Sequence, residues 1–399
     1  MTENNTTTSS DSRLRAVPVQ PIEISDGVLL VRGNMAVKLS GEGAAEAAQI
    51  VLTAAAGEGA TPQELINLFG ALDRPGAEEL VKILVARRLL VPCDSFPVPS
   101  ANGETAQEVF YWEFGERADQ VAARLGTRRI AVLGVNCISR QLVRTLPDCG
   151  FERVAVVDYP LLRNLRLFPG DTLAAEGWTG RVPVSFEQWE QQLDEGLDCL
   201  VATADFSGQQ LLRHWNSWCV NRGCTFLPVM LDKGIGCVGP LVVPGETACY
   251  ECLRARENSN LEDPETRRAA EILVAVVRRS DLNGFLPPMA SILGDIAAME
   301  LTKFYGGVLT ARVGTLLEVN LLRPELRAQS VEGAALQRVQ SSDPAIDDQP
   351  GEVQFPAGRA PGPVDEPMNG WGTYGILEAP DRCHRPPRGP TRRHREEGR

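Results

Sequence analysis

Arg129-Ile-Ala-Val-Leu-Gly134 is a short apolar run that ends in glycine, and a helix-like segment, Arg140–Leu146, follows it. A second run, Val154-Ala-Val-Val-Asp158, comes next and ends in an acid. Strand-like apolar runs that alternate with helix-like segments are typical of a largely parallel β-sheet covered by helices. The alternation continues over residues 109–326, and we therefore expect an α/β domain of the Rossmann type there.

The segment before this domain has a different pattern. Gly27–Arg32 and Asn34–Leu39 are β-rich runs on either side of Gly33, which favours a hairpin. Three helix-like segments follow, one near residues 44–55, one that opens at Thr61 and one over residues 75–89. A hairpin and three short helices predict a winged helix-turn-helix module over residues 21–95.

Composition and charge limit the classes of partner. The chain has 399 residues and a formal net charge of −12. A general nucleic-acid binder needs basic surface to neutralise phosphates, so we expect no nucleic-acid partner. Met1–Ser12 lacks the apolar core of a secretory signal, and no apolar run is long enough to span a bilayer. We therefore expect a cytoplasmic protein without a membrane partner, whose ten cysteines are reduced thiols.

Three segments lie outside the two expected domains. We expect residues 1–20 to be disordered, residues 96–108 to form a linker, and residues 327–399 to form a disordered tail. The tail is rich in proline, arginine and glycine. Such a composition cannot bury enough apolar surface to offset the entropy of the chain.

The amino-terminal module carries three segments in a recognisable order. They are Asp26-Gly-Val-Leu-Leu-Val-Arg-Gly-Asn-Met-Ala-Val-Lys-Leu-Ser-Gly41, Gly59-Ala-Thr-Pro-Gln-Glu-Leu65 and Leu84-Val-Ala-Arg-Arg-Leu-Leu-Val-Pro92. Together they resemble the PqqD-like recognition element of enzymes that modify ribosomally made peptides. The resemblance implies that the module binds the leader of a precursor peptide.

The larger domain carries a second resemblance. Its most specific segment is Pro240-Leu-Val-Val-Pro-Gly-Glu-Thr-Ala-Cys-Tyr-Glu-Cys-Leu-Arg-Ala-Arg256, and Ala202-Thr-Ala-Asp205 precedes it. Residues 109–323 are similar to the ThiF-like, ubiquitin-activating-type fold, in the form used by partner proteins of YcaO cyclodehydratases. These partner proteins occur in the pathways that make thiazole/oxazole-modified microcins (TOMM) and thiopeptides.

The resemblance implies a nucleotide site at Gly134, Asp158 and Asp205. Side chains at Asn136 and Cys137 would crowd a nucleotide where active relatives have a glycine-rich turn. Leu167 stands where the family has an arginine that contacts the triphosphate. One carboxylate without a cationic clamp cannot stabilise phosphoryl-transfer charge, so we expect a vestigial site that does not adenylate.

The resemblance also implies a metal site at Cys249 and Cys252. A structural zinc needs four ligands, and the family's second Cys-x-x-Cys pair is missing here. Beyond Leu322 only Cys383 remains, although Cys219 and Cys224 could substitute. A structural zinc is therefore left open, and no other cofactor is expected.

We interpret the protein as a leader-peptide-binding scaffold that is not an enzyme by itself. It would deliver a ribosomal precursor to a separate YcaO cyclodehydratase, which uses the ATP and forms the azolines. The peptide would add to the strand Asn34–Leu39 beside the helix 75–89. The expected peptide contacts are Asn34, Ala36, Lys38, Lys82 and Arg87. Because ThiF-like relatives often dimerise, a homodimer is also left open.

Two other functions compete with this interpretation. An active ThiF-type enzyme would adenylate its substrate with ATP and would depend on Asp205. A winged-helix regulator would bind DNA through its third helix. That helix offers no asparagine, glutamine or serine to read base edges and carries Glu78 and Glu79, which disfavours DNA binding.

Overall fold

A computed structural model gives the positions of most of the chain. It describes residues 12–94, 104–178, 181–192, 196–260, 263–277, 284–323 and 325–331. Every described residue lies in one compact unit, which falls within residues 1–340. Within the described residues, no helix is long and apolar enough to cross a membrane.

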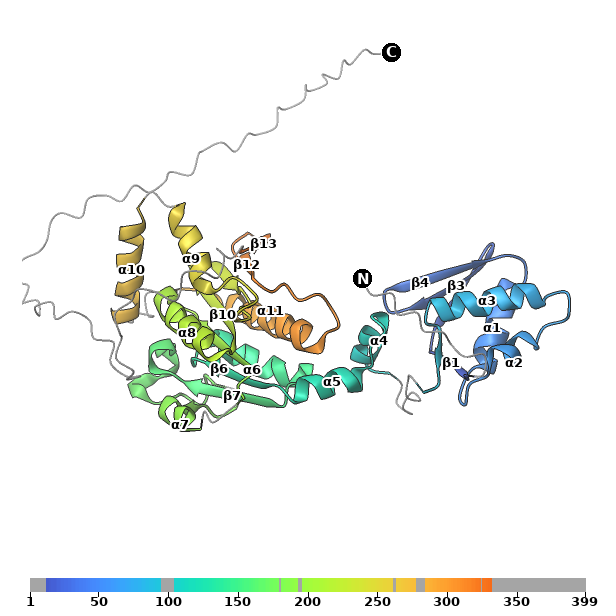
Figure 1. Cartoon of the computed structure of the whole chain (residues 1–399), viewed down its shortest axis with the longest axis horizontal. Coiled ribbons are helices and arrows are strands. Elements are labelled where there is room, and N and C mark those ends of the chain that lie inside the picture. The colour runs from blue at the N-terminus through green and yellow to red at the C-terminus, as the bar shows by residue number, and fades with distance from the viewer. Residues whose placement is uncertain are drawn as a thin grey trace, which may run out of the picture. The chain divides into compact units, whose positions relative to one another are not determined.

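The amino-terminal module combines two small sheets with three helices (Figure 1). Its elements are β1 (Leu14–Ala16), β2 (Gln20–Ile24), β3 (Gly27–Arg32), β4 (Met35–Ser40), α1 (Ala44–Ala54), α2 (Pro62–Ile66), α3 (Arg74–Ala86) and β5 (Leu90–Pro92). Strands β2, β3 and β4 form one sheet in that order, and β1 pairs with β5. Strand β4 is therefore an edge strand.

The predicted hairpin and helices of this module are confirmed. Strand β3 pairs with β4 across the two-residue turn Gly33-Asn34, where Gly33 has a φ of 56° that suits glycine. The side chains of Thr61 and Glu64 form the capping box at the start of α2. The expected disordered lead is wrong for residues 14–20, because β1 pairs with β5 and buries Leu14 in the core of the module.

A helix that the sequence did not predict follows the module. Helix α4 (Ala106–Glu113) begins inside the expected linker, with Thr105 and Glu108 forming its capping box. Trp112 on α4 is 2% exposed and belongs to the same apolar core as the helices of the module. Residues 96–103 of the expected linker lie outside the described residues. The helix therefore packs on the core of the amino-terminal module through Trp112 and on the core of the large domain through Tyr111.

The larger domain is built on an eight-stranded sheet in the order β13-β12-β11-β10-β9-β6-β7-β8. Its elements are α5 (Ala118–Gly126), β6 (Arg129–Leu133), α6 (Cys137–Cys149), β7 (Arg153–Asp158), β8 (Val184–Ser185), α7 (Phe186–Gln191), β9 (Cys199–Ala204), α8 (Gln209–Arg222), β10 (Thr225–Asp232), β11 (Ile235–Val238), α9 (Tyr250–Ser259), α10 (Pro264–Val277), α11 (Pro287–Gly306), β12 (Thr315–Asn320) and β13 (Glu325–Ser330). Strands β8, β7, β6, β9 and β10 run parallel, while β11, β12 and β13 each pair antiparallel with the strand before them. The α/β class is confirmed, with a mixed sheet.

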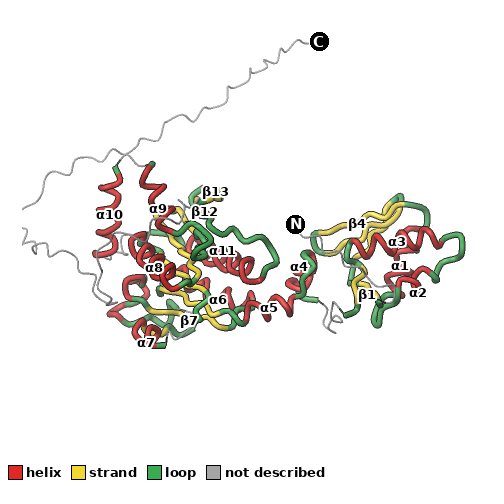
Figure 2. The backbone as a smooth tube through the Cα atoms, in the orientation of Figure 1, coloured by secondary structure: helices red, strands yellow, loops and turns green. Residues whose placement is uncertain are grey.

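Helices cover both faces of this sheet (Figure 2). On one face, α5, α6 and α11 pack against side chains such as Ile130 and Val132 of β6. On the other face, α7, α8 and α9 pack against Ala131 and Leu133 of the same strand. Side chains that alternate between two buried faces explain why β6 is apolar throughout its length.

The expected start of the tail at residue 327 is too early. Residues 327–330 belong to β13, which pairs with β12 along its whole length. The remainder of the expected tail, residues 332–399, lies outside the described residues.

Candidate functional site

The expected nucleotide site lies where β6 passes into α6. Gly134 follows β6 with a φ of 100°, and a Cβ added there would lie 2.9 Å from both the Leu162 Cβ and the Thr203 carbonyl oxygen. Glycine is therefore required at this position by the packing of the chain's own loops. Its presence is not by itself a sign of a phosphate-binding turn.

The amino terminus of α6 is capped by the protein's own side chains. The Asn136 Oδ1 accepts from the N–H groups of Ile138 and Ser139, at 3.1 and 3.0 Å. The Cys137 N–H donates to Asp205 at 2.9 Å, and the Asn136 N–H donates to the Ser139 Oγ at 2.9 Å. All four of the N–H groups that a helix start offers to an anion are thus already used.

Asp205 is buried and takes part in the hydrogen bonds at the start of α6. Its Oδ2 accepts from the Cys137 N–H and, at 2.8 Å, from the Asn164 Nδ2. Its Oδ1 is buried and has no hydrogen-bond partner among the described residues. Burial raises the pKa of Asp205 above its ordinary value. Burial and the neighbouring Asp205 charge also raise the pKa of the Cys137 thiol to about 12, so this cysteine is not a ready nucleophile.

Asp158, the third residue expected to bind a nucleotide, is also paired with another side chain of the protein. Asp158 ends β7 and accepts two hydrogen bonds from the Arg163 guanidinium, at 2.6 and 2.8 Å. The same guanidinium lies 4.4 Å from the centre of the Phe168 ring. Leu167, at the position of the family's arginine, is 8% exposed and packs in the core. The structure therefore brings Gly134, Asp158 and Asp205 to one edge of the sheet, but in a closed arrangement.

The cysteine pair at the start of α9 is close but incomplete as a metal site. The Sγ atoms of Cys249 and Cys252 lie 3.7 Å apart. In the described part of the chain, no cluster of three or more His, Cys, Asp or Glu side chains could hold a metal ion. Cys219 and Cys224 are buried in the apolar core of the sheet, and Cys383 lies outside the described residues. Zinc at Cys249 and Cys252 stays a prediction.

The expected peptide site centres on the free edge of β4. In a two-residue hairpin the flanking pair, here Arg32 and Met35, exchanges hydrogen bonds, and such pairs alternate along the strands. The backbone groups of Ala36 and Lys38 therefore point away from β3. No other strand among the described residues pairs with β4. This edge can accept an added strand.

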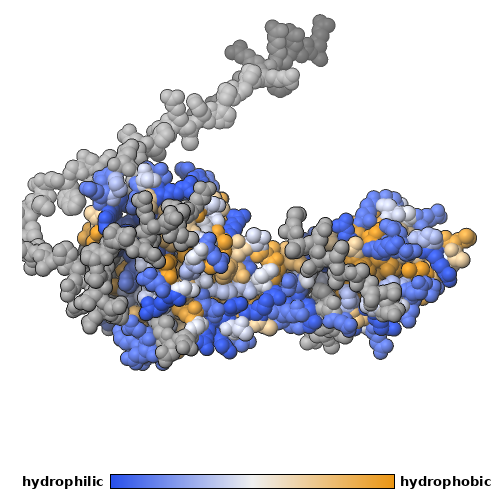
Figure 3. All heavy atoms as spheres, viewed as in Figure 1, coloured by the Kyte–Doolittle hydropathy of each residue, from blue (hydrophilic) through white to orange (hydrophobic). Residues whose placement is uncertain are grey.

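The side chains expected to touch the peptide do not all lie together. Ala36 and Lys38 face the exposed side of the small sheet, and the Lys38 Nζ pairs with Asp26 at 2.7 Å. Lys82 pairs with Glu78 on the exposed side of α3. Arg87 at the end of α3 falls on the same helical face as the half-buried Leu80 and Ile83. Arg87 is thus better placed than Lys82 beside apolar surface, which Figure 3 shows over α3 and the neighbouring strands.

Asn34 has a role that its position in the sequence does not reveal. Its N–H and its Nδ2 both donate to the Glu113 carboxylate, at 2.6 and 3.1 Å. Asn34 therefore fixes α4 to the hairpin turn. Glu113 and Arg163 were missed from the sequence, because each acts through a partner that local spacing does not specify.

Comparisons with known proteins support the fold. No family model and no curated protein matches this sequence. Among solved structures, Escherichia coli MccB with succinimide superposes with a TM-score of 0.57 at 14% identity, covering 82% of this chain and 98% of that one. MccB with AMPCPP and MccA gives a TM-score of 0.56. A heterocyclase in complex with substrate and cofactor gives 0.50 at 18% identity, over 81% of this chain and 38% of that one.

These likenesses establish the fold of the chain. Its large domain has the Rossmann-type α/β fold seen in MccB, as the ThiF-like resemblance implied. Since residues 118–331 of the large domain make up little more than half of the sequence, matches of this coverage also take in residues of the amino-terminal module.

Proposed function

We propose that this protein binds the leader of a ribosomally made precursor peptide and presents the precursor to a separate modifying enzyme. The observation that carries the proposal is the combination of an open β4 edge with a closed nucleotide edge in one chain. Two sets of structural neighbours fit this class of function. MccB has been solved with the peptide MccA, and the other neighbour is a heterocyclase with its substrate.

The closed edge argues against an adenylating enzyme. Three cap interactions use the α6 N–H groups that would hold phosphates, and Arg163 occupies the Asp158 carboxylate. Asp205, which would face a magnesium ion, is 1% exposed. A nucleotide would have to displace all of these internal partners before binding. We therefore assign ATP consumption and azoline formation to a YcaO cyclodehydratase partner.

Leader binding would use strand addition. The outward N–H and C=O groups of Ala36 and Lys38 would bond to the leader backbone and supply affinity. The half-buried Met35, Leu80 and Ile83 offer apolar contact to leader side chains. Arg87 is exposed on the same face of α3 and suits an acidic leader residue.

Fluorescence polarisation with a labelled leader peptide, taken from the precursor gene nearest this one, tests the proposal on the full chain without ATP. We expect low-micromolar or tighter binding. Ala36→Pro removes an outward N–H without removing a bond to β3, and an edge strand tolerates proline. It should weaken binding by about tenfold or more.

Ala36→Val is the matched control, because it changes the same side chain and keeps the N–H. We expect this variant to bind nearly as the unchanged protein does. Absence of leader binding by the unchanged protein at concentrations far above that range would refute the proposal. Equal affinity of the proline and valine variants would place the peptide elsewhere on the molecule.

A further inference from the structure

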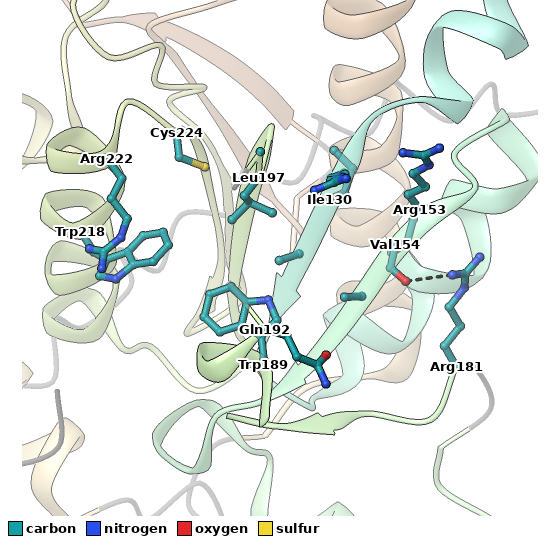
Figure 4. A pocket seen from close by; sticks show the side chains of 14 residues that line it. Ile130, Arg153, Val154, Arg181, Trp189, Gln192, Leu197, Trp218, Arg222 and Cys224 are labelled. Atoms are coloured by element: carbon teal, nitrogen blue, oxygen red, sulfur yellow. Dashed lines mark hydrogen bonds between the residues drawn. The ribbon is translucent and has the colours of Figure 1, made fainter. Parts of the chain in front are cut away.

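A pocket of about 720 Å³ opens at the amino-terminal edge of the parallel strands. Arg129 and Arg153 begin β6 and β7, so the pocket lies at the opposite end of these strands from Gly134 and Asp158. Figure 4 shows Trp218 and Arg222 of α8 on one side and Arg153 and Arg181 on the other. The pocket is therefore separate from the closed nucleotide edge.

The pocket exists because two small side chains lie next to each other on the sheet. Ala131 of β6 and Ala155 of β7 are register partners, so their side chains share one face. On the neighbouring strand β9, the register partner of Ala131 is Leu200, which is fully buried. Helix α7, only six residues long, does not fill the space that the alanines leave.

The walls of the pocket are aromatic. The rings of Trp189 on α7 and Trp218 on α8 have centroids 5.9 Å apart, and Figure 4 shows Leu197 of the lining between Trp218 and Ile130. The Arg222 guanidinium lies 4.3 Å from the centre of the Trp218 ring. A flat apolar ligand could contact these rings while an anionic group met the guanidinium.

The charge of the pocket is opposite to that of the chain. Among the described residues, four arginines line it (Arg129, Arg153, Arg181 and Arg222) and no acidic residue does. The whole chain carries a formal charge of −12. Arg181 donates to the carbonyl oxygens of Val154 and Glu152, each at 2.9 Å, which holds its charge at the rim. These bonds also occupy the backbone at the start of β7, so an extended peptide cannot add to that strand.

We propose that this pocket binds a small organic anion in which a planar aromatic ring carries a phosphate group. The ring would lie against Trp189 and Trp218 above the two alanines, and the phosphate would bond to Arg222 beside Trp218, while Arg153 on the other side of the pocket adds to the positive potential. Arginine recognises phosphate through paired N–H donors, and the pocket volume falls in the range of small-molecule sites. The proposal is independent of leader binding at β4.

Isothermal titration calorimetry with 1-naphthyl phosphate on the full chain tests this site. 1-Naphthol and inorganic phosphate are the controls for each half of the ligand, and both should bind much more weakly. Added salt should weaken the binding of 1-naphthyl phosphate, because part of the attraction is between exposed charges. Arg153→Gln with Arg222→Gln should weaken it by about tenfold or more, with most of the loss due to Arg222.

The matched control is Arg74→Gln with Arg312→Gln, which removes two exposed arginines outside the pocket and should leave the affinity unchanged. Equal loss in both double variants would mean non-specific charge attraction and would overturn the proposal. Equal binding of 1-naphthol, or binding of an acidic peptide but not of 1-naphthyl phosphate, would overturn it too. Leader binding should survive in the Arg153/Arg222 variant, which separates the two sites.

Discussion

At the scale of single residues, Asp205 is the most informative side chain. The sequence marks it as a magnesium-side acid, but the structure makes it the cap of α6 and the partner of Asn164. One of its oxygens is buried without a partner among the described residues. A buried carboxylate with one oxygen that accepts no hydrogen bond destabilises the fold, and a neutral amide at the same position would remove the buried charge.

Asp205→Asn should therefore be neutral or stabilising. The amide oxygen can accept from Cys137 and Asn164, and no buried charge remains. Asp205→Ala should lower the free energy of unfolding by about 1–3 kcal/mol, because two buried donors lose their acceptor. Chemical denaturation of the two variants beside the unchanged protein measures both effects. An asparagine variant as unstable as the alanine variant would contradict the interpretation.

The pH dependence has a definite sign. The folded-state pKa of Asp205 lies above the ordinary value of 3.8, so the folded protein holds this proton more tightly than the unfolded chain. The tighter binding of this proton stabilises the folded protein fully at pH values below 3.8. This stabilisation is lost as the pH rises through the raised pKa of Asp205. The advantage of Asp205→Asn should thus be larger at neutral pH than at pH values near 4. Denaturation curves of both proteins at the two pH values test this.

At the scale of elements, α4 is the unexpected component. Arg32 of β3 donates twice to Glu104, at 2.5 and 2.8 Å, and its guanidinium lies 4.4 Å from the centre of the Trp112 ring. The Trp112 Nε1 donates to the Arg88 carbonyl at 3.1 Å. These contacts join α4 to β3 and to the end of α3, so the amino-terminal module is complete only with this helix.

Arg32→Met should lower the free energy of unfolding by about 3 kcal/mol. The Arg32 side chain is 4% exposed and Glu104 is 19% exposed, so its loss leaves a largely buried carboxylate unpaired. Arg74→Met removes an exposed arginine and should change stability by no more than about 0.5 kcal/mol. Chemical denaturation of the two variants gives the comparison. Similarly small effects of Arg32→Met and Arg74→Met would mean that the Arg32–Glu104 ion pair does not stabilise the fold.

A fragment comparison tests the boundary of the module. Residues 1–116 include α4, whereas residues 1–95 leave the site of Trp112 empty and its neighbours exposed. We expect a higher Tm for the longer fragment, since removal of a buried tryptophan typically costs about 3–5 kcal/mol. Thermal unfolding followed by circular dichroism measures the difference. Equal Tm values would place α4 outside the module.

At the scale of the whole molecule, the chain combines an open strand edge with a closed nucleotide edge. The N–H groups at the start of α6 already donate hydrogen bonds to the protein's own side chains. These groups are therefore not available to bind phosphates at that edge of the sheet. The proposed division of labour follows from this: peptide binding here and ATP-driven chemistry in a partner.

The isolated protein should give no ATP–pyrophosphate exchange, with or without a precursor peptide. Heterocycle formation should require addition of a YcaO cyclodehydratase, and leader variants that bind this protein poorly should be modified slowly. Exchange by the purified chain, abolished by Asp205→Asn, would support the competing adenylating function. Mass spectrometry of the precursor reports the loss of water for each ring formed.

The sequence by itself determined the local elements. The apolar runs Arg129–Gly134 and Val154–Asp158 specify buried strands, because side chains of a strand between two helical layers must be apolar on both faces. The pair Gly33-Asn34 specifies a tight hairpin, and Thr61 with Glu64 specifies a helix start. Each of these signals is carried by residues a few positions apart.

Only the tertiary structure decided which distant residues meet. Asn136, Asn164 and Asp205 converge because β6 and β9 are neighbours in the sheet, and Trp189 meets Trp218 because α7 and α8 cover the same face. Arg32 finds Glu104 after a separation of 72 residues. Spacing along the chain encodes periodicity but not these pairings. The closure of the nucleotide edge, the docking of α4 and the arginine-lined pocket therefore became visible only in three dimensions.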